Sequence, residues 1–214
     1  MEPADQILEL SEENGKEKEG KSADEKFRSR TALIIAIMAM LLAITSLGGG
    51  NAGEDIMNNN IEASDTWAFY QAKSIRQTEY KLAAERLEVE LRMRGDQLSP
   101  EVRQDVQRRI DQYNETVKRY EDEPDTNDPN NPLKGEGKKQ LAARANDYAA
   151  QRDRAQKQDP NFDYAEAFFQ IAIVLASVSI LATSRRIMQF ALVVGLLATA
   201  LMLNGYFLFF PLPF

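Results

Sequence analysis

Side chains that could take part in metal binding or acid chemistry are concentrated in an acidic stretch near the middle of the chain. Five carboxylates stand within eight residues at 121–128 (EDEPDTND). Loops rich in carboxylates can bind hard cations, so Asp125 and Asp128 are weak candidate metal ligands. The EF-hand spacing, with its central glycine and terminal glutamate, is missing. We therefore expect a solvated loop and assign no metal site.

Composition excludes most other chemistry. The 214 residues contain no cysteine and no histidine, which excludes thiol nucleophiles, thiolate zinc sites, Fe–S clusters and Ser-His-Asp triads. No two carboxylates can be assigned to a shared apolar cleft. The basic residues of 100–121 alternate with acidic ones and the net charge is −7, which argues against nucleic-acid binding. We predict no catalytic residues, no cofactor and no enzymatic activity.

Three charge-free runs dominate the architecture, at 31–47, 167–184 and 187–214. Each approaches or exceeds the about 17–25 residues that span a bilayer. The sequence therefore predicts an all-α fold with transmembrane helices at 31–48, 166–184 and 187–210, preceded by a disordered polar tail at 1–30. The first run could instead be a cleaved signal peptide, but its long acidic leader favours an uncleaved anchor.

The distribution of basic residues predicts the orientation in the membrane. Arg28 and Arg30 precede the first span, and Arg185 and Arg186 form the turn between the other two. Because loops rich in Lys and Arg stay in the cytoplasm, we expect the N-terminus and this turn inside. The segment 49–165 would then be exterior, which is periplasmic for a bacterial inner (cytoplasmic) membrane.

The exterior segment is predicted to be helical. Residues 54–94 lack Gly and Pro, and Gly95 signals a stop. Ser99 is expected to cap a second helix that begins at Pro100. The short turn predicts an antiparallel, coiled-coil-like helical hairpin. After a loop at 123–137, a shorter third helix covers about 138–157 and ends at Asp159-Pro160-Asn161.

Two apolar stripes mark the first exterior helix. One repeats every seven residues and the other is shorter, and both need covering, which predicts self-association. The first comprises Ile61, Ala68, Ile75, Leu82 and Val89, and the second comprises Tyr80, Leu87 and Leu91.

Within the spans, small residues recur every four positions and predict close helix packing. They are Ala172 and Ala176 in the second span, and Ala191, Gly195 and Thr199 in the third. The buried amide of Asn204 needs a hydrogen-bonding partner, which we expect across an oligomer. Trp67, Tyr70 and Tyr206 are predicted to anchor helices at the membrane interface, and Lys73 is assigned to the same interface.

Two motifs carry a resemblance. Residues 65–77 (DTWAFYQAKSIRQ) and 169–177 (FQIAIVLAS) resemble the signatures of a bacterial family of uncharacterised three-span membrane proteins, a domain of unknown function. The first has the pattern W-x-[FY]-Y-Q-A-K-S-I and follows the first span. The resemblance implies topology and helical content, and it implies no activity.

Together these patterns predict an integral membrane protein acting as a homo-oligomeric scaffold or interaction module. The expected partners are the lipid bilayer, a second copy and an unidentified protein. A second possible function is a channel-like or transport-accessory assembly lined by the second and third spans. A third is a membrane-bound enzyme, which would be restricted to carboxylates, lysines and hydroxyls.

Overall fold

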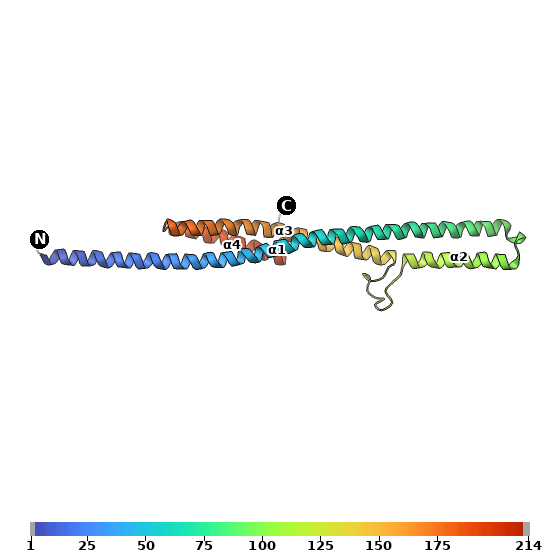
Figure 1. The fold of residues 1–214 in the computed structure, drawn as a ribbon, viewed down its shortest axis with the longest axis horizontal. Helices are drawn as coiled ribbons and strands as arrows, with labels where there is room; N and C mark the ends of the chain where they lie inside the picture. Colours follow the sequence, from blue (N-terminus) through green and yellow to red (C-terminus); the bar gives the residue numbers. More distant parts are fainter. Residues whose placement is uncertain (1–2, 212–214) are drawn as a thin grey trace. The chain divides into compact units, whose positions relative to one another are not determined.

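The computed structural model describes the backbone of residues 3–211 and the side chains of residues 24–211. Its elements are α1 (Pro3–Arg94), the 3-10 helix η1 (Gly95–Gln97), α2 (Pro100–Glu121), α3 (Lys138–Leu181) and α4 (Arg185–Phe207) (Figure 1). The only β-type pairing in this described part is an isolated bridge between Pro124 and Gly135. The predicted all-α class is confirmed.

The chain divides into two compact units. Unit 1 combines Met1–Gly53 with Ala155–Phe214, and unit 2 is Glu54–Arg154. The helices α1 and α3 therefore contribute to both units. Each unit has its own packing and is described separately.

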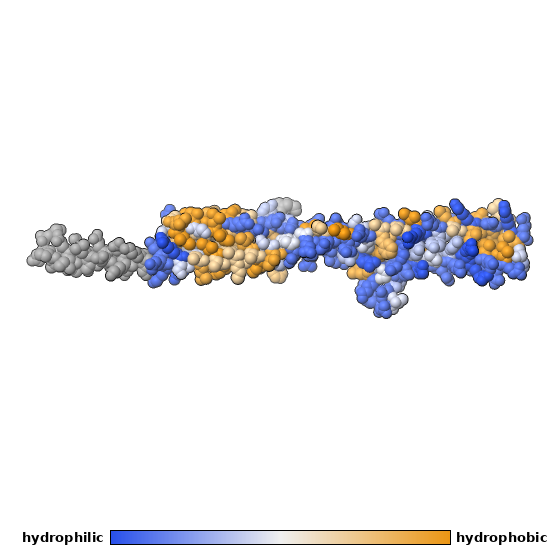
Figure 2. Space-filling model, viewed as in Figure 1, coloured by the Kyte–Doolittle hydropathy of each residue, from blue (hydrophilic) through white to orange (hydrophobic). Residues whose placement is uncertain are grey.

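Unit 1 packs three helices around small and apolar side chains. Met38 of α1, Phe169 of α3 and Ala198 of α4 belong to one buried cluster. Leucine, valine and phenylalanine side chains cover the outside, as the hydrophobic surface in Figure 2 shows. The helices α1, α3 and α4 are each long and apolar enough to cross a membrane.

One aromatic ring sets how closely the helices of unit 1 approach. The buried ring of Phe162 packs edge-on against Tyr206, with centroids 4.9 Å apart. A methyl group added at Gly48 would lie 2.6 Å from this ring, and one added at Gly205 would lie 2.7 Å from it. The two glycines thus make the space that Phe162 fills.

The helix that contains the first predicted span does not end at the glycines, because α1 is one continuous helix to Arg94. The sequence predicted separate helices at 31–48 and 54–94. Glycine is a poor helix former, but the burial of Phe162 against Gly48 offsets a cost of about 1 kcal/mol per glycine. The predicted disordered tail falls mostly on residues 1–23, whose side chains lie outside the described part. The backbone from residue 3 to residue 30 is helical as part of α1.

The predicted break at Asp159-Pro160-Asn161 is also wrong. The helix α3 runs through Pro160 without ending, although proline removes a hydrogen bond and costs about 3 kcal/mol within a helix. Asn161 and Phe162 directly after it are buried. The Asn161 side chain donates to the carbonyl of Lys157 at 2.8 Å, which adds a hydrogen bond to the turn that proline weakens.

In unit 2, α2 and the beginning of α3 both lie along α1 (Figure 1). Ser99 caps α2 by accepting from Val102 N, as predicted. Tyr80 of α1 contacts Tyr113 and Tyr120 of α2, with centroids 5.5 and 5.9 Å apart. Nearer the start of unit 2, Asn60 of α1 accepts a hydrogen bond from Arg152 of α3. One face of α1 is therefore covered first by α3 and then by α2.

The covered face of α1 follows a strict alternation of three- and four-residue steps, the spacing of paired helices. We call it the inner seam. Its eleven residues are buried or half-buried: Ile56, Asn59, Ala63, Thr66, Tyr70, Lys73, Gln77, Tyr80, Ala84, Leu87 and Leu91.

The inner seam contains the shorter predicted stripe and leaves out the longer one. Ile61, Ile75, Leu82 and Val89 are 46–62 % exposed. By apolar content alone, the longer stripe is the face expected to be covered. A seven-residue repeat keeps residues on one side of a helix but does not say which side the chain covers. The face that the chain covers is more polar at its centre.

Replacing Gly48 by alanine tests the packing around Phe162. We expect Gly48→Ala to lower the free energy of unfolding by about 1–3 kcal/mol through overpacking. Gly50→Ala is the control, because the added methyl meets nothing within 4 Å apart from its own stretch of helix, and it should stabilise by up to about 1 kcal/mol. Thermal unfolding in detergent micelles, followed by circular dichroism, measures both. Equal transition temperatures would contradict the close packing of Phe162 on Gly48.

Candidate functional site

The buried polar side chains of unit 2 gather where α2 ends and α3 begins. Lys73, Gln77 and Gln140 are 7, 3 and 8 % exposed. Lys73 and Gln77 come from the inner seam, and Gln140 from the first turn of α3. Together with their charged partners they form the polar junction, which comprises Lys73, Gln77, Glu121, Glu123, Lys138 and Gln140.

Lys73 is the most heavily partnered cation of the junction. Its ammonium lies 3.1 Å from the carboxylate of Glu123 and donates to the main-chain oxygen of Glu136. It also lies 5.7 Å from the ring centroid of Phe69 and 5.3 Å from that of Tyr120. A buried ammonium is tolerated only when it is paired and hydrogen-bonded, and these contacts supply the pairing.

Gln77 joins α1 to both neighbouring helices. Its amide nitrogen donates to Val117 O at 2.9 Å and to Glu121 at 3.0 Å. Its amide oxygen accepts from the ammonium of Lys138 at 3.0 Å. Lys138 also pairs with Glu121 at 3.3 Å and lies 5.4 Å from the ring centroid of Tyr70.

The same junction closes the loop between α2 and α3. Glu136 N donates to Glu123 O at 2.9 Å. The Gln140 amide accepts from Glu123 N and donates to Asp122 at 2.7 Å. Gly135 has a φ of +107° and lies against Glu123 O, a conformation that only glycine adopts without strain. The loop is therefore held at both ends.

Two carboxylates here, those of Glu121 and Asp122, are held in their ionised form. Hydrogen bonds from Gln77 and then Lys138 lower the pKa of Glu121, and those from Lys139 and then Gln140 lower the pKa of Asp122. A general acid needs the opposite shift, towards neutral pH. The geometry suits a structural clamp.

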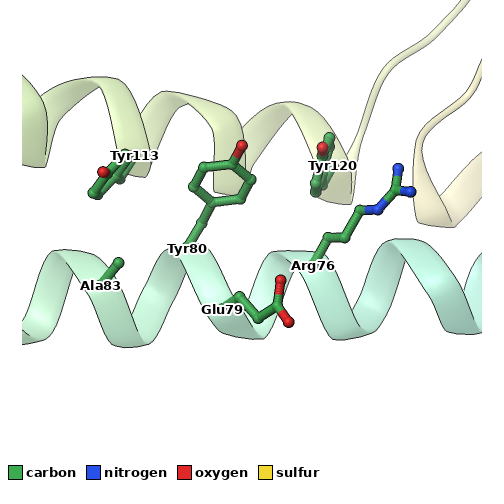
Figure 3. A pocket seen from close by; sticks show the side chains of 6 residues that line it. All are labelled: Arg76, Glu79, Tyr80, Ala83, Tyr113 and Tyr120. Carbon is green, nitrogen blue, oxygen red and sulfur yellow. The ribbon is translucent and has the colours of Figure 1, made fainter.

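A cavity of about 440 Å³ lies beside the junction, between α1 and α2. Figure 3 shows Tyr80 reaching from α1 between Tyr113 and Tyr120 of α2. Arg76 and Glu79 also line it, and the described part of the chain gives neither an ion-pair partner. The cavity is thus amphipathic, with aromatic rings and one charge of each sign.

The two weak metal candidates have other partners. Asp128 pairs with Lys134 at 2.9 Å, and hydrogen bonds from Lys134 and then Asn131 lower its pKa. The Asp125 carboxylate accepts from the main-chain nitrogens of Asn127 and Asp128. Within the described residues, no cluster of three or more acidic side chains could hold a metal ion.

The predicted interface anchors make contacts within their own units. Trp67 and Tyr70 pack edge-on, with centroids 5.3 Å apart, and Tyr70 faces the ammonium of Lys138. Tyr206 donates from its hydroxyl to Ile44 O at 3.1 Å. Whether these residues also meet a membrane interface stays a prediction, as does the orientation drawn from Arg28, Arg30, Arg185 and Arg186.

The small residues of the spans pack within the chain. Ala172, Ala176 and Ala191 are fully buried, and a methyl group added at Gly195 would lie 3.3 Å from Met38 of α1. Thr199 is half-buried and donates to Gly195 O. These contacts join three helices of one copy.

Asn204 finds its partners in its own chain, where we expected another subunit. Its amide nitrogen donates to the Asn161 side chain at 2.7 Å and to Phe210 O at 3.0 Å, and its oxygen accepts from Phe210 N. Asn161 and Asn204 stand 43 positions apart in the sequence and meet because α3 and α4 pack together in unit 1.

The sequence pattern did not reveal Gln77, Lys138 and Gln140, and it indicated an interface role for Lys73. The available signal was spacing: Lys73 and Gln77 continue the three- and four-residue steps of the inner seam. Because both side chains are polar, they do not belong to an apolar stripe.

Removing the Lys73 ammonium tests the clamp. We expect Lys73→Met to lower the free energy of unfolding of unit 2 by about 1–3 kcal/mol, because Glu123 loses its nearer ion-pair partner and Glu136 O loses a hydrogen bond. The exposed Lys81 provides the control, and Lys81→Met should change stability by less than about 0.5 kcal/mol. Urea unfolding in micelles, followed by the fluorescence of the single tryptophan, Trp67, measures both. Matching midpoints would refute the clamp.

Acid should weaken the junction through Glu121. Because its pKa is lowered in the folded protein, its contribution is present above the ordinary glutamate pKa of about 4.3 and is lost as pH falls through the lowered value. Glu121→Gln should therefore destabilise at pH 7, and the difference from wild type should narrow below pH about 4. Glu79→Gln is the control. A difference that stays constant with pH would contradict this assignment.

No curated protein and no solved structure matches the chain. One family model matches residues 27–208, under the description Domain of unknown function (DUF4337). The match covers all of unit 2, including the polar junction, and all of α4. The chain therefore belongs to the DUF4337 family, a family of unknown function.

Proposed function

We propose that this protein is a three-span membrane protein whose unit 2 is a non-enzymatic, homo-oligomeric scaffold. The length and apolar character of α1, α3 and α4 support membrane insertion. The outward-facing leucine, valine and phenylalanine side chains of unit 1 support it further, because lipid solvates such a surface and water does not.

The proposed orientation puts the N-terminus and the turn before α4 in the cytoplasm of a bacterial cell. The basic residues at both places support it. Unit 2 would then extend from the outer face of the inner membrane, where a helical surface can meet other proteins.

The observation that carries the scaffold proposal is the uncovered stripe on α1. Ile61, Ile75, Leu82 and Val89 are 46, 62, 49 and 49 % exposed and stand on one face at intervals of seven or fourteen residues. Scattered apolar residues on a surface are ordinary, but a continuous line of them indicates an interaction site.

The contacts of the polar side chains favour a scaffold over an enzyme or a pore. Glu121 and Asp122 are kept ionised by their hydrogen bonds, which does not suit acid catalysis. Asn204, a polar side chain of the predicted third span, directs its amide to Asn161 and Phe210, which does not suit a side chain that lines a pore. We propose no cofactor and no nucleic-acid partner.

Counting copies in the membrane tests the scaffold. The full chain, fused to a fluorescent protein, should bleach in two or more steps per spot in native membrane vesicles. Leu82→Glu should raise the share of single-step spots, because it puts a charge in the apolar line, whereas Lys81→Glu at the adjacent position should not. Single-step bleaching of the unaltered chain at every density would overturn the proposal.

A further inference from the structure

A second line of helix-pairing residues runs along α1 on the side away from the inner seam. It alternates steps of four and three residues over eight positions and contains no charged residue. We call it the outer seam: Met57, Ile61, Ser64, Ala68, Gln71, Ile75, Thr78 and Leu82. Val89 continues its apolar line one heptad further.

The outer seam is solvent-exposed and lies on the opposite side of α1 from the inner seam. All eight side chains are exposed. Gln77 and Ala84 of the inner seam follow Ile75 and Leu82 by two residues, which is about 200° around a helix. The contacts of α1 with α2 and α3 therefore leave the outer seam free.

The spacing restricts what can cover this face. Alternating steps of three and four residues let a second helix insert its side chains between those of the first along its whole length. Charged residues flank the outer seam at Asp65, Glu79, Lys81 and Arg86 but stay outside it. The face is shaped for another helix with an uncharged seam of the same repeat, and the outer seam itself is such a partner.

We propose that the outer seam pairs with the outer seam of a second copy of this chain, parallel and in register. This inference rests on the proposed membrane function. Two copies inserted in one bilayer with the same topology have α1 pointing the same way and starting at the same height. Each seam residue then meets its own counterpart, as in a parallel two-stranded coiled coil.

The contact area between the two copies is small, which suits a dimer whose association is favoured by confinement to one membrane. From Met57 to Val89 the line is about 48 Å long, and a helix is about 10 Å wide. The two copies would bury about 1,000 Å² in total, below the about 1,200 Å² at which standard interfaces begin. Confinement to one bilayer raises the effective concentration, so association should be strong in lipid and weaker in dilute detergent.

Cysteine crosslinking tests direction and register, because the chain has no cysteine of its own. Ile61→Cys and Leu82→Cys lie about 31 Å apart along α1. In membranes containing the full chain, each variant alone should form a covalent dimer under mild oxidation, severalfold more than Lys81→Cys, which lies about 100° around the helix from position 82. A mixture of the two variants should form few mixed dimers.

The outcomes separate this inference from the function on which it rests. In the mixture, crosslinks that form only between an Ile61→Cys chain and a Leu82→Cys chain would indicate an antiparallel pair and overturn the inference. No enrichment over Lys81→Cys, in a protein that still bleaches in several steps, would overturn the inference and leave the scaffold standing. Single-step bleaching would overturn both.

Discussion

The architecture depends on one geometric constraint: α1 pairs with its own chain along one face and keeps a second face with the same repeat. Seven residues make nearly two helical turns, so each line stays on its side for many turns. In unit 2 this covered face of α1 packs first against α3 and then, further along α1, against α2. The outer seam remains available at about 200°. In the scaffold proposal, a second copy of the chain covers that second face.

The polar junction explains why the inner seam is not apolar throughout. Where α2 ends and α3 begins, the partner of α1 changes and the loop leaves the helices. Apolar side chains there would leave the loop's carbonyls and carboxylates unpaired, which costs more than a hydrogen bond contributes. Lys73 and Gln77 supply donors at that level. The motif at 65–77 thus contains the residues that join α1 to α2, the loop and α3.

Local signals predicted the parts of the fold that local chemistry decides, such as the Ser99 cap and the stop at Gly95. They failed where packing outweighs helix propensity. Phe162 of α3 is buried against Gly48, and both α1 at Gly48 and α3 at Pro160 continue as helices. Of the site, Lys73 was noticed but assigned another role, and Gln140 was missed. Asn161 and Asn204 are too far apart in sequence for a pattern to pair them. The seven-residue repeat was recognised, but a repeat does not say which face the chain covers itself.

The central claim is that one face of α1 is reserved for a second copy. A nitroxide at Ile75→Cys, within the outer seam, tests it most directly by pulsed electron paramagnetic resonance in lipid bilayers. Packed helices lie about 8–10 Å apart, so we expect one short distance between copies that disappears when labelled protein is diluted with unlabelled protein. Only a background that scales with protein density, with no defined distance, would contradict the claim.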